Sequence, residues 1–137
     1  MSTGLARLKH RADFLRVAER RRRAVRDGLI LQAAPCPPQA TEAAVIRVGF
    51  TASRRVGNAV LRNRAKRRLR AAAAEVLARE GRAGTDYVLI ARAATPARPY
   101  RALVGDLAGA LRQIERARDR PGGDDRSRPA KEERDDP

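Results

Sequence analysis

Two long segments in the second half of the chain place apolar residues at the spacing of an α-helix. The first spans residues 58–79, and its apolar stripe consists of Leu61, Ala65, Leu69, Ala72 and Val76. Gly81 and Gly84 follow this segment and predict the end of the helix. The second begins near Tyr100, and its stripe consists of Leu103, Leu107, Ala110, Leu111 and Ile114.

Three shorter segments have the composition of β-strands. Residues 29–31 and 86–91 are apolar runs typical of buried strands. Residues 45–53 alternate as a half-buried strand does, with Val48, Phe50 and Ala52 on one side and, on the other, Arg47, Gly49, Thr51 and Ser53.

The N-terminal segment predicts a shorter helix. Residues 5–8 lead into a helical pattern whose apolar positions are Ala12, Leu15 and Ala18, with Phe14 beside them. The order of elements is then helix, strands, helix, strand, helix. This order predicts an α+β fold, a two-layer α/β sandwich with the helices packed on one sheet.

The length of 137 residues allows one domain with tails. Three of the residues at positions 35–38 are proline, and with the polar residues after them they predict a loop. Residues 119–137 contain glycine, proline and many charges but no Leu, Ile, Val or aromatic residue. We therefore predict a single domain over residues 1–118 and a disordered charged tail over residues 119–137.

The chain is strongly basic, with 31 Lys and Arg against 16 Asp and Glu and a formal net charge of +15. Such an excess predicts a polyanionic partner. All but three of the cations are Arg, whose planar guanidinium matches phosphate bidentately, which favours nucleic acid. A membrane partner is disfavoured because the chain has no Trp and no long apolar run.

No acidic residue lies between Glu42 and Glu75, although nine cations do: Arg47, Arg54, Arg55, Arg62, Arg64, Lys66, Arg67, Arg68 and Arg70. A merely solvated helix face normally mixes charges of both signs. On a helix, the residues opposite the apolar stripe are Asn63, Lys66, Arg67 and Arg70. Gly57 permits a sharp turn and Asn58 can cap the helix, so the segment predicts a phosphate-binding helix after a strand.

The sequence offers little for catalysis by the protein itself. Cys36 and His10 are the only residues of their kinds, so neither a disulfide nor a metal cluster is predicted. The acids Asp13, Asp27, Asp86 and Asp106 are scattered along the chain, which disfavours a nuclease acting alone. A general RNA- or DNA-binding module, such as a ribosomal protein, fits the composition as well as any more specific RNA-binding role.

The segment RVGFTASRRVGNAVLRNRAKRRLR, residues 47–70, closely resembles the signature of the bacterial ribonuclease P protein family, including its Arg-Asn-Arg motif at Arg62-Asn63-Arg64. LKHRADF at residues 8–14 resembles the N-terminal helix of the family, and DYVLIAR at residues 86–92 resembles a later strand. The resemblance implies a fold like that of the second domain of ribosomal protein S5. It also implies a left-handed βαβ crossover through the Arg-Asn-Arg helix, against the usual right-handed preference.

The resemblance implies a protein subunit of ribonuclease P, a ribonucleoprotein endonuclease that removes the 5′ leader from precursor transfer RNA. Catalysis is then expected in the RNA subunit with Mg²⁺, and neither catalytic residues nor a tight metal site is expected in the protein. We expect one protein per ribonuclease P RNA, a monomer when free, and a cytoplasmic location because no secretory signal is visible. The alternative is a general RNA-binding or ribosome-associated protein without a cleavage role.

The resemblance assigns two sets of binding residues. Those facing the catalytic RNA are Arg54, Arg55, Asn58, Arg62, Asn63, Arg64, Lys66, Arg67, Arg68 and Arg70. Those binding the single-stranded leader, in a cleft between the first helix and the sheet, are Phe14, Arg47, Thr51 and Ser53. Phe14 can stack on any base or belong to the core, and both interpretations stay open.

Two departures from the family bear on leader binding. Ala18 stands where the family often has an aromatic residue, and another is common near Gln32, so we expect weak stacking. Separately, Arg20 to Arg23 form a second basic cluster at the end of the first helix, which a solvated surface also explains.

Overall fold

The computed structural model describes residues 5–37 and 45–119. Its elements in chain order are β1 (Leu5–Arg7), α1 (Arg11–Glu19), β2 (Arg23–Val25), β3 (Leu29–Pro35), β4 (Ile46–Thr51), the 3₁₀ helix η1 (Arg54–Val56), α2 (Ala59–Glu80), β5 (Thr85–Ala91) and α3 (Tyr100–Asp119). The predicted tail beyond α3 lies outside the described residues, as does most of the proline-containing loop.

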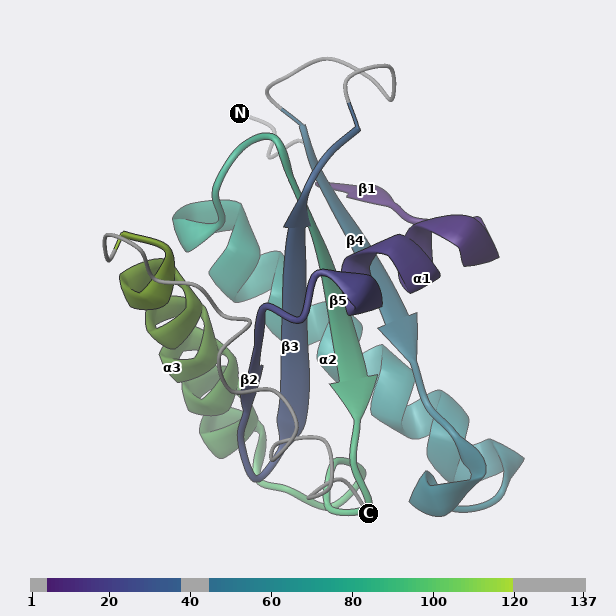
Figure 1. Ribbon diagram of the computed structural model, residues 1–137. Helices are drawn as coiled ribbons and strands as arrows, with labels where there is room; N and C mark the ends of the chain where they lie inside the picture. Colours follow the sequence, from purple (N-terminus) through teal and green to yellow (C-terminus); the bar gives the residue numbers. More distant parts are fainter. Residues whose placement is uncertain (1–4, 38–44, 120–137) are drawn as a thin grey trace.

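One five-stranded sheet in the order β1-β4-β5-β3-β2 forms the centre of the fold. β1, β4 and β5 run parallel to one another, whereas β3 and β2 are antiparallel to their neighbours. Helices α2 and α3 cover one face of the sheet, and α1 crosses the other (Figure 1). The predicted α+β fold on a single sheet is confirmed, with α1 on the face opposite the two long helices.

The connection from β4 through α2 to β5 joins two parallel neighbouring strands. In Figure 1 both strands point downwards, β4 lies to the right of β5, and α2 passes behind them. This path is left-handed, as the family resemblance implied, and it is rare among βαβ units.

The main core lies between the sheet and the two long helices. The predicted stripe of α3 is confirmed, and that of α2 is confirmed except at Leu61, which is half-buried. The buried residues of α2 are Ala65, Leu69, Ala72, Ala73, Val76 and Leu77, and those of α3 include Leu103, Leu107, Ala110, Leu111 and Ile114. From the sheet, Leu29, Leu31, Tyr87 and Leu89 are fully enclosed among them. The alanines of α2 have short side chains, which let that helix lie close to the sheet.

The predicted stripe of α1 is wrong. Ala12, Leu15 and Ala18 face solvent, and Leu15 is 51% exposed. The helix instead buries Val17 and packs the half-buried Phe14 on the sheet, in a small second cluster with Leu8, Ala34 and Val88. Phe14 is the largest apolar side chain of α1, and the side of the helix that carries it is the side packed on the sheet.

The edge strands β1 and β2 were not predicted. Each has three residues, which is too short for an alternating pattern to be visible in a sequence. β1 occupies positions that were assigned to the approach to the first helix, and it pairs Leu5 with Ile46. β2 pairs Arg23 with Gln32, directly after the basic run at the end of α1.

Replacing Leu69 by Ala tests the packing of α2. Leu69 is fully buried, so we expect Leu69→Ala to lower the free energy of unfolding by about 3 kcal/mol through the cavity it leaves. The matched control is Leu15→Ala on the outer side of α1, which we expect to change it by less than about 0.5 kcal/mol. Urea denaturation measures both, and equal losses would contradict the assignment of the buried sides.

Candidate nucleic-acid interface

The cationic segment begins in a tightly built turn. Gly57 has a φ of +141°, and Asn58 caps α2 by accepting a hydrogen bond from the Leu61 amide at 2.9 Å. The Ser53 hydroxyl accepts from the Arg55 amide at 3.3 Å, which orders η1. Arg62 donates to the Gly57 carbonyl at 3.3 Å. The predicted glycine turn and asparagine cap are confirmed, and they fix the direction in which α2 leaves the sheet.

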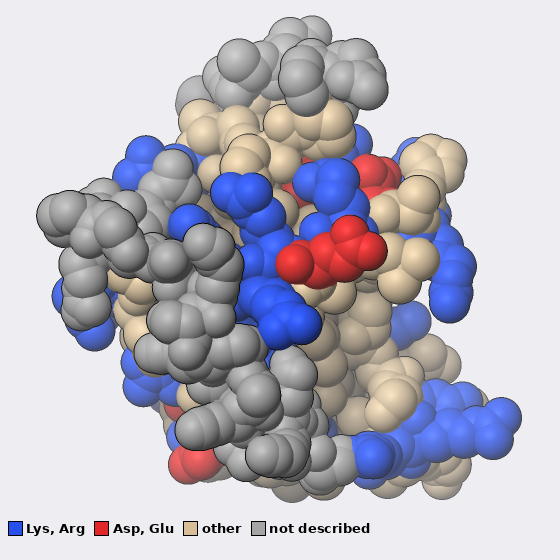
Figure 2. All heavy atoms as spheres, viewed as in Figure 1, with Lys and Arg blue, Asp and Glu red and all other residues tan. Residues whose placement is uncertain are grey.

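The polar side of α2 points to solvent. Arg54, Arg55, Asn58, Asn63, Arg64, Arg67 and Arg70 are exposed, and half-buried positions are held by Arg62, Lys66 and Arg68. Within the described residues, none of these cations forms an ion pair. Figure 2 shows basic side chains gathered at lower right, where η1 and the start of α2 lie in Figure 1. The face is therefore an uncompensated positive surface.

Two of the predicted cations also hold the fold together. Arg68 donates through Nη2 to the carbonyl oxygen of Arg98, which joins α2 to the segment before α3. The guanidinium of Arg70 lies over the ring of Phe50 at 5.6 Å from its centroid, a cation–π contact with β4. These two side chains are less free to reach a ligand than Arg64 and Arg67.

A buried ion network lies under α1, on the opposite face of the sheet. The Asp86 carboxylate is fully buried at the start of β5 and accepts from Arg47 Nε at 2.8 Å and from Arg47 Nη2 at 2.7 Å. Arg16 of α1 donates to the same carboxylate, and the Cys36 thiol donates to it at 2.9 Å. Asp13 lies 3.4 Å from both arginines. The network ties α1 to two central strands.

The network sets the protonation of its members. Burial acts to raise the pKa of Asp86, but the hydrogen bonds from Arg47, Cys36 and Arg16 outweigh it and hold that pKa below its ordinary value. Burial and the hydrogen bond to Asp86 raise the pKa of the Cys36 thiol to about 11. Cys36 is therefore a protonated hydrogen-bond donor at neutral pH rather than a nucleophile.

The residues predicted to bind the leader have different surroundings. Arg47 is neutralised by Asp86, and its side chain is largely buried. Phe14 is half-buried against Gly49, where an added Cβ would lie 2.5 Å from the Phe14 ring. Thr51 is half-buried at the end of β4, and Ser53 is exposed just beyond it. Of the four predicted leader-binding residues, Thr51 and Ser53 are thus neither in α1 nor part of the ion network.

Sequence reasoning did not find the network. Asp86 and Asp13 were identified only as scattered acids, and the network joins segments 70 residues apart in sequence. The one signal available was an aspartate at the head of an apolar run that is otherwise typical of a buried strand, because a buried carboxylate needs cationic or hydrogen-bonding partners.

The described residues contain no group of three or more His, Cys, Asp or Glu side chains placed to hold a metal ion. Among the described helices there is no apolar stretch of the length that a membrane span requires. An α+β domain with one helix that is apolar inside and, over residues 59–74, cationic without any acid outside has the form of a polyanion-binding protein.

Comparisons with known proteins agree with this class. Residues 3–115 match the Ribonuclease P family. The ribonuclease P protein component of Paramagnetospirillum magneticum is 54% identical over 114 residues, covering 83% of this chain and 86% of the relative. That of Ruegeria pomeroyi is 51% identical over 114 residues, covering 82% and 89%.

Solved structures show the same fold. The RNase P protein of Staphylococcus aureus superimposes with a TM-score of 0.62 at 24% identity, covering 80% of this chain and 94% of that one. The RNase P protein of Thermotoga maritima gives a TM-score of 0.59 at 22% identity, covering 80% and 96%. The chain belongs to the ribonuclease P protein family. Its role is thus that of a protein subunit in a ribonucleoprotein nuclease of transfer RNA processing.

Replacing Asp86 by Asn tests the buried network. The asparagine keeps the shape but leaves Arg47 and Arg16 with only the more distant carboxylate of Asp13, so we expect a loss of about 3 kcal/mol in the free energy of unfolding at neutral pH. Urea denaturation measures this loss. An unchanged free energy of unfolding would show that the network does not stabilise the fold.

The dependence of the free energy of unfolding on acidic pH gives a second test of the same variant. An aspartate in the unfolded chain has a pKa of about 3.9, and the pKa of Asp86 in the folded protein is lower. The stabilisation that ionised Asp86 gives to the fold is therefore complete above the unfolded pKa. It is lost as the pH falls through the folded pKa. We expect Asp86→Asn to flatten the fall of wild-type stability below about pH 4 in urea denaturation. Parallel acid limbs for both proteins would contradict this.

Proposed function

We propose that this protein binds the RNA subunit of ribonuclease P through the exposed side of η1 and α2 and assists removal of the 5′ leader from precursor transfer RNA. The observation that carries the proposal is that the apolar and the cationic residues of α2 lie on opposite sides of the helix. Its inner side is packed in the core, and its outer side holds cations that have no acidic partner among the described residues.

The energetics of this face favour an RNA ligand. Like charges on adjacent turns of a helix repel each other in the free protein. Phosphates relieve that repulsion and release counterions, which makes binding favourable and dependent on salt. Arg64 and Arg67 are exposed and unpaired among the described residues, so they are the first candidates for phosphate contacts. The exposed Asn63 amide beside them can donate to a phosphate or a base edge.

The leader belongs, in this proposal, on the other face of the sheet. Thr51 and Ser53 lie at the end of β4, next to the start of the cationic face. A strand that leaves the active centre of the RNA can pass from η1 onto this surface, past the edge of Phe14. Arg47 contributes by holding α1 in place, because its charge is taken up by Asp86.

The chemistry of cleavage is assigned to the RNA. In the proposal, Mg²⁺ is held by the RNA, one protein binds one RNA, and the protein supplies positive charge and positioning. The rival function is general RNA binding without a role in cleavage. The two differ in one observable, which is stimulation of RNA-dependent cleavage at low Mg²⁺.

Reconstitution with a bacterial ribonuclease P RNA tests the proposal. We expect the wild-type protein to stimulate cleavage of a precursor transfer RNA at low Mg²⁺, and Arg62→Ala/Arg64→Ala/Lys66→Ala to lose at least about tenfold of that stimulation. The measurement is the initial rate of leader release. Protein alone and RNA alone are assayed beside the complex.

The matched control removes three cations from other surfaces, as Arg79→Ala/Arg112→Ala/Arg116→Ala. We expect this variant to keep most of the stimulation, because its arginines lie at the end of α2 and on α3. If both triple variants lost the same stimulation of cleavage, the effect would depend on net charge and not on the position of the cations on α2. Tight RNA binding without any stimulation by the wild type would favour the general RNA-binding function.

A further inference from the structure

Tyr100, at the start of α3, is the most exposed aromatic residue of the protein. Of the two Phe and two Tyr of the chain, Tyr87 is fully buried, and Phe14 and Phe50 are half-buried. Tyr100 is 36% exposed and contacts α2. An exposed aromatic ring next to cations is a typical contact for an unpaired base of RNA, because any base can stack on it. The ring is therefore a candidate RNA contact outside α2.

The Tyr100 side chain reaches α2 on the side of that helix that carries Arg64. Its hydroxyl donates to Glu75 Oε1 at 3.1 Å. Residues spaced by three or four positions lie on one line along a helix, and on this line they are Arg64, Arg68, Ala71 and Glu75. The line begins in the Arg-Asn-Arg motif and is about 16 Å long. Tyr100 therefore stands at the far end of the cationic face of α2, where Glu75 ends the run of positive charge.

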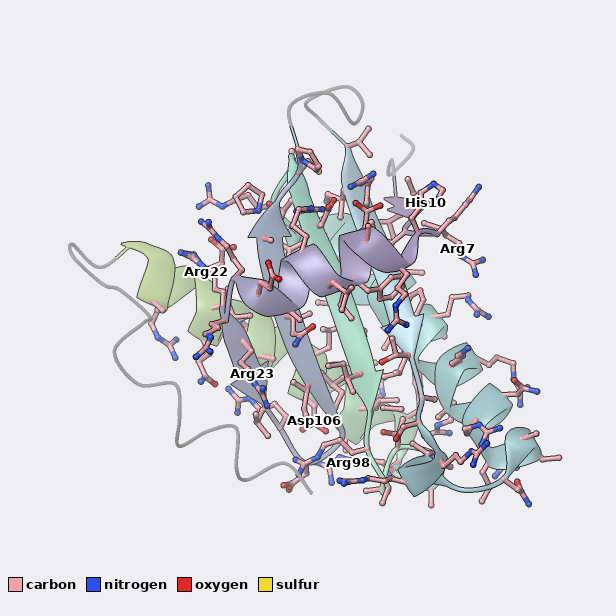
Figure 3. All side chains as sticks on the ribbon, turned by 45° about the vertical axis from the view of Figure 1, so that its right-hand side comes forward. Arg7, His10, Arg22, Arg23, Arg98 and Asp106 are labelled. Carbon is pink, nitrogen blue, oxygen red and sulfur yellow. The ribbon has the colours of Figure 1, made fainter. Side chains whose placement is uncertain are left out.

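The start of α3 is fixed against α2 by contacts that do not involve the Tyr100 ring. Arg68 donates through Nη2 to the Arg98 carbonyl. The Arg98 guanidinium donates to the Asp106 carboxylate at 2.6 Å and 3.1 Å, and Figure 3 shows both residues at the lower end of the molecule. These contacts position the backbone at Tyr100 before any ligand binds, which lowers the ordering cost of a contact with the ring.

The charges around Tyr100 fit a base on the ring with phosphates to its sides. Arg101 is exposed and has no ion pair in the part of the chain that the structure describes. Burial and the hydrogen bond to Glu75 raise the pKa of Tyr100. The charges of Arg101 and Arg68 act against that rise, so both guanidinium groups lie near the hydroxyl. The Glu75 carboxylate disfavours a phosphate at the tip of the ring but can accept a hydrogen bond from a base amino group.

We propose that Tyr100 stacks on an unpaired base of the ribonuclease P RNA, so that the RNA interface extends from α2 onto the start of α3. The proposal rests on the proposed function and adds a base contact to a face that otherwise binds phosphates. Arg64 and Arg101 bind phosphates on the two sides of the stacked base, and Glu75 favours a base with an amino group over uracil. Stacking adds affinity without neutralising a phosphate, so its salt dependence distinguishes it from a charge contact.

Tyr100→Ala and Tyr100→Phe separate stacking from the hydrogen bond to Glu75. Phenylalanine keeps the ring, so we expect it to bind ribonuclease P RNA as tightly as the wild type. Alanine removes the ring, and we expect binding about tenfold weaker. The slope of log affinity against log salt concentration should stay unchanged in Tyr100→Ala, whereas Arg64→Ala should make it shallower by about one phosphate contact. The measurement is the Kd for that RNA, without precursor, at several salt concentrations.

Tyr100→Leu distinguishes stacking from packing. Leucine keeps an apolar side chain against α2 but has no aromatic face. We expect Tyr100→Leu to bind the RNA about as weakly as Tyr100→Ala, with a melting temperature close to that of Tyr100→Phe. If the residue only joined α3 to α2, the RNA affinities of the variants would instead follow their melting temperatures.

Tyr100→Trp gives a direct signal, because the chain has no other tryptophan. A base stacked on the indole should quench its fluorescence when the RNA binds. The matched control is Ala117→Trp, an exposed position about 25 Å away at the other end of α3, where we expect little change.

Several results would overturn the inference. Wild-type affinity in Tyr100→Ala would show that the ring does not bind RNA, and wild-type affinity in Tyr100→Leu would assign it to packing. Unquenched fluorescence of Tyr100→Trp in the RNA complex would exclude stacking. A loss that appears only when the complex binds precursor transfer RNA would place the base in the precursor. Failure of the proposed function is visible separately, because the wild type would then not stimulate cleavage.

Discussion

The carboxylate of Asp86 is enclosed where β5 begins and receives hydrogen bonds from α1, from β4 and from the residue after β3. A buried charge is tolerated only with such partners, so these segments can meet in one arrangement only. α1 is nine residues long and buries little apolar area beyond Val17 and Phe14. Its place on the sheet therefore depends on this ion network, and so does the extent of sheet surface left open beside it.

The opposite face follows a different constraint. α2 is cationic along its outer side, which disfavours the free helix, so its stability comes from the packed inner side. Ala65, Leu69 and Ala72 provide that packing without any exposed fraction. Gly57 and Asn58 then fix where the helix starts. The charges are thereby held in a fixed arrangement before any ligand arrives, which lowers the ordering cost of binding.

Strong periodic patterns were predictable from the sequence, and short or long-range features were not. α2, α3, β4 and β5 follow from apolar spacing, and the cap at Asn58 follows from residue type. β1 and β2 have three residues each and leave no pattern. The buried side of α1 was misjudged because the pattern counted Ala12 and Ala18 as equal to Phe14. The ion pairs of Asp86 depend on tertiary contacts, and the crossover hand was known only from the family resemblance.

The structure also distinguishes arginines that are paired inside the protein from arginines that are free to contact a ligand. The formal charge of +15 counts both kinds alike. Arg16 and Arg47 are neutralised by buried acids, and Arg68 is tied to a backbone carbonyl. A cation already paired inside the protein contributes little when counterions are released from RNA. In the proposed function, the phosphate contacts are therefore fewer than the net charge suggests, and we expect them on the outer side of α2, where the cations have no described acidic partner.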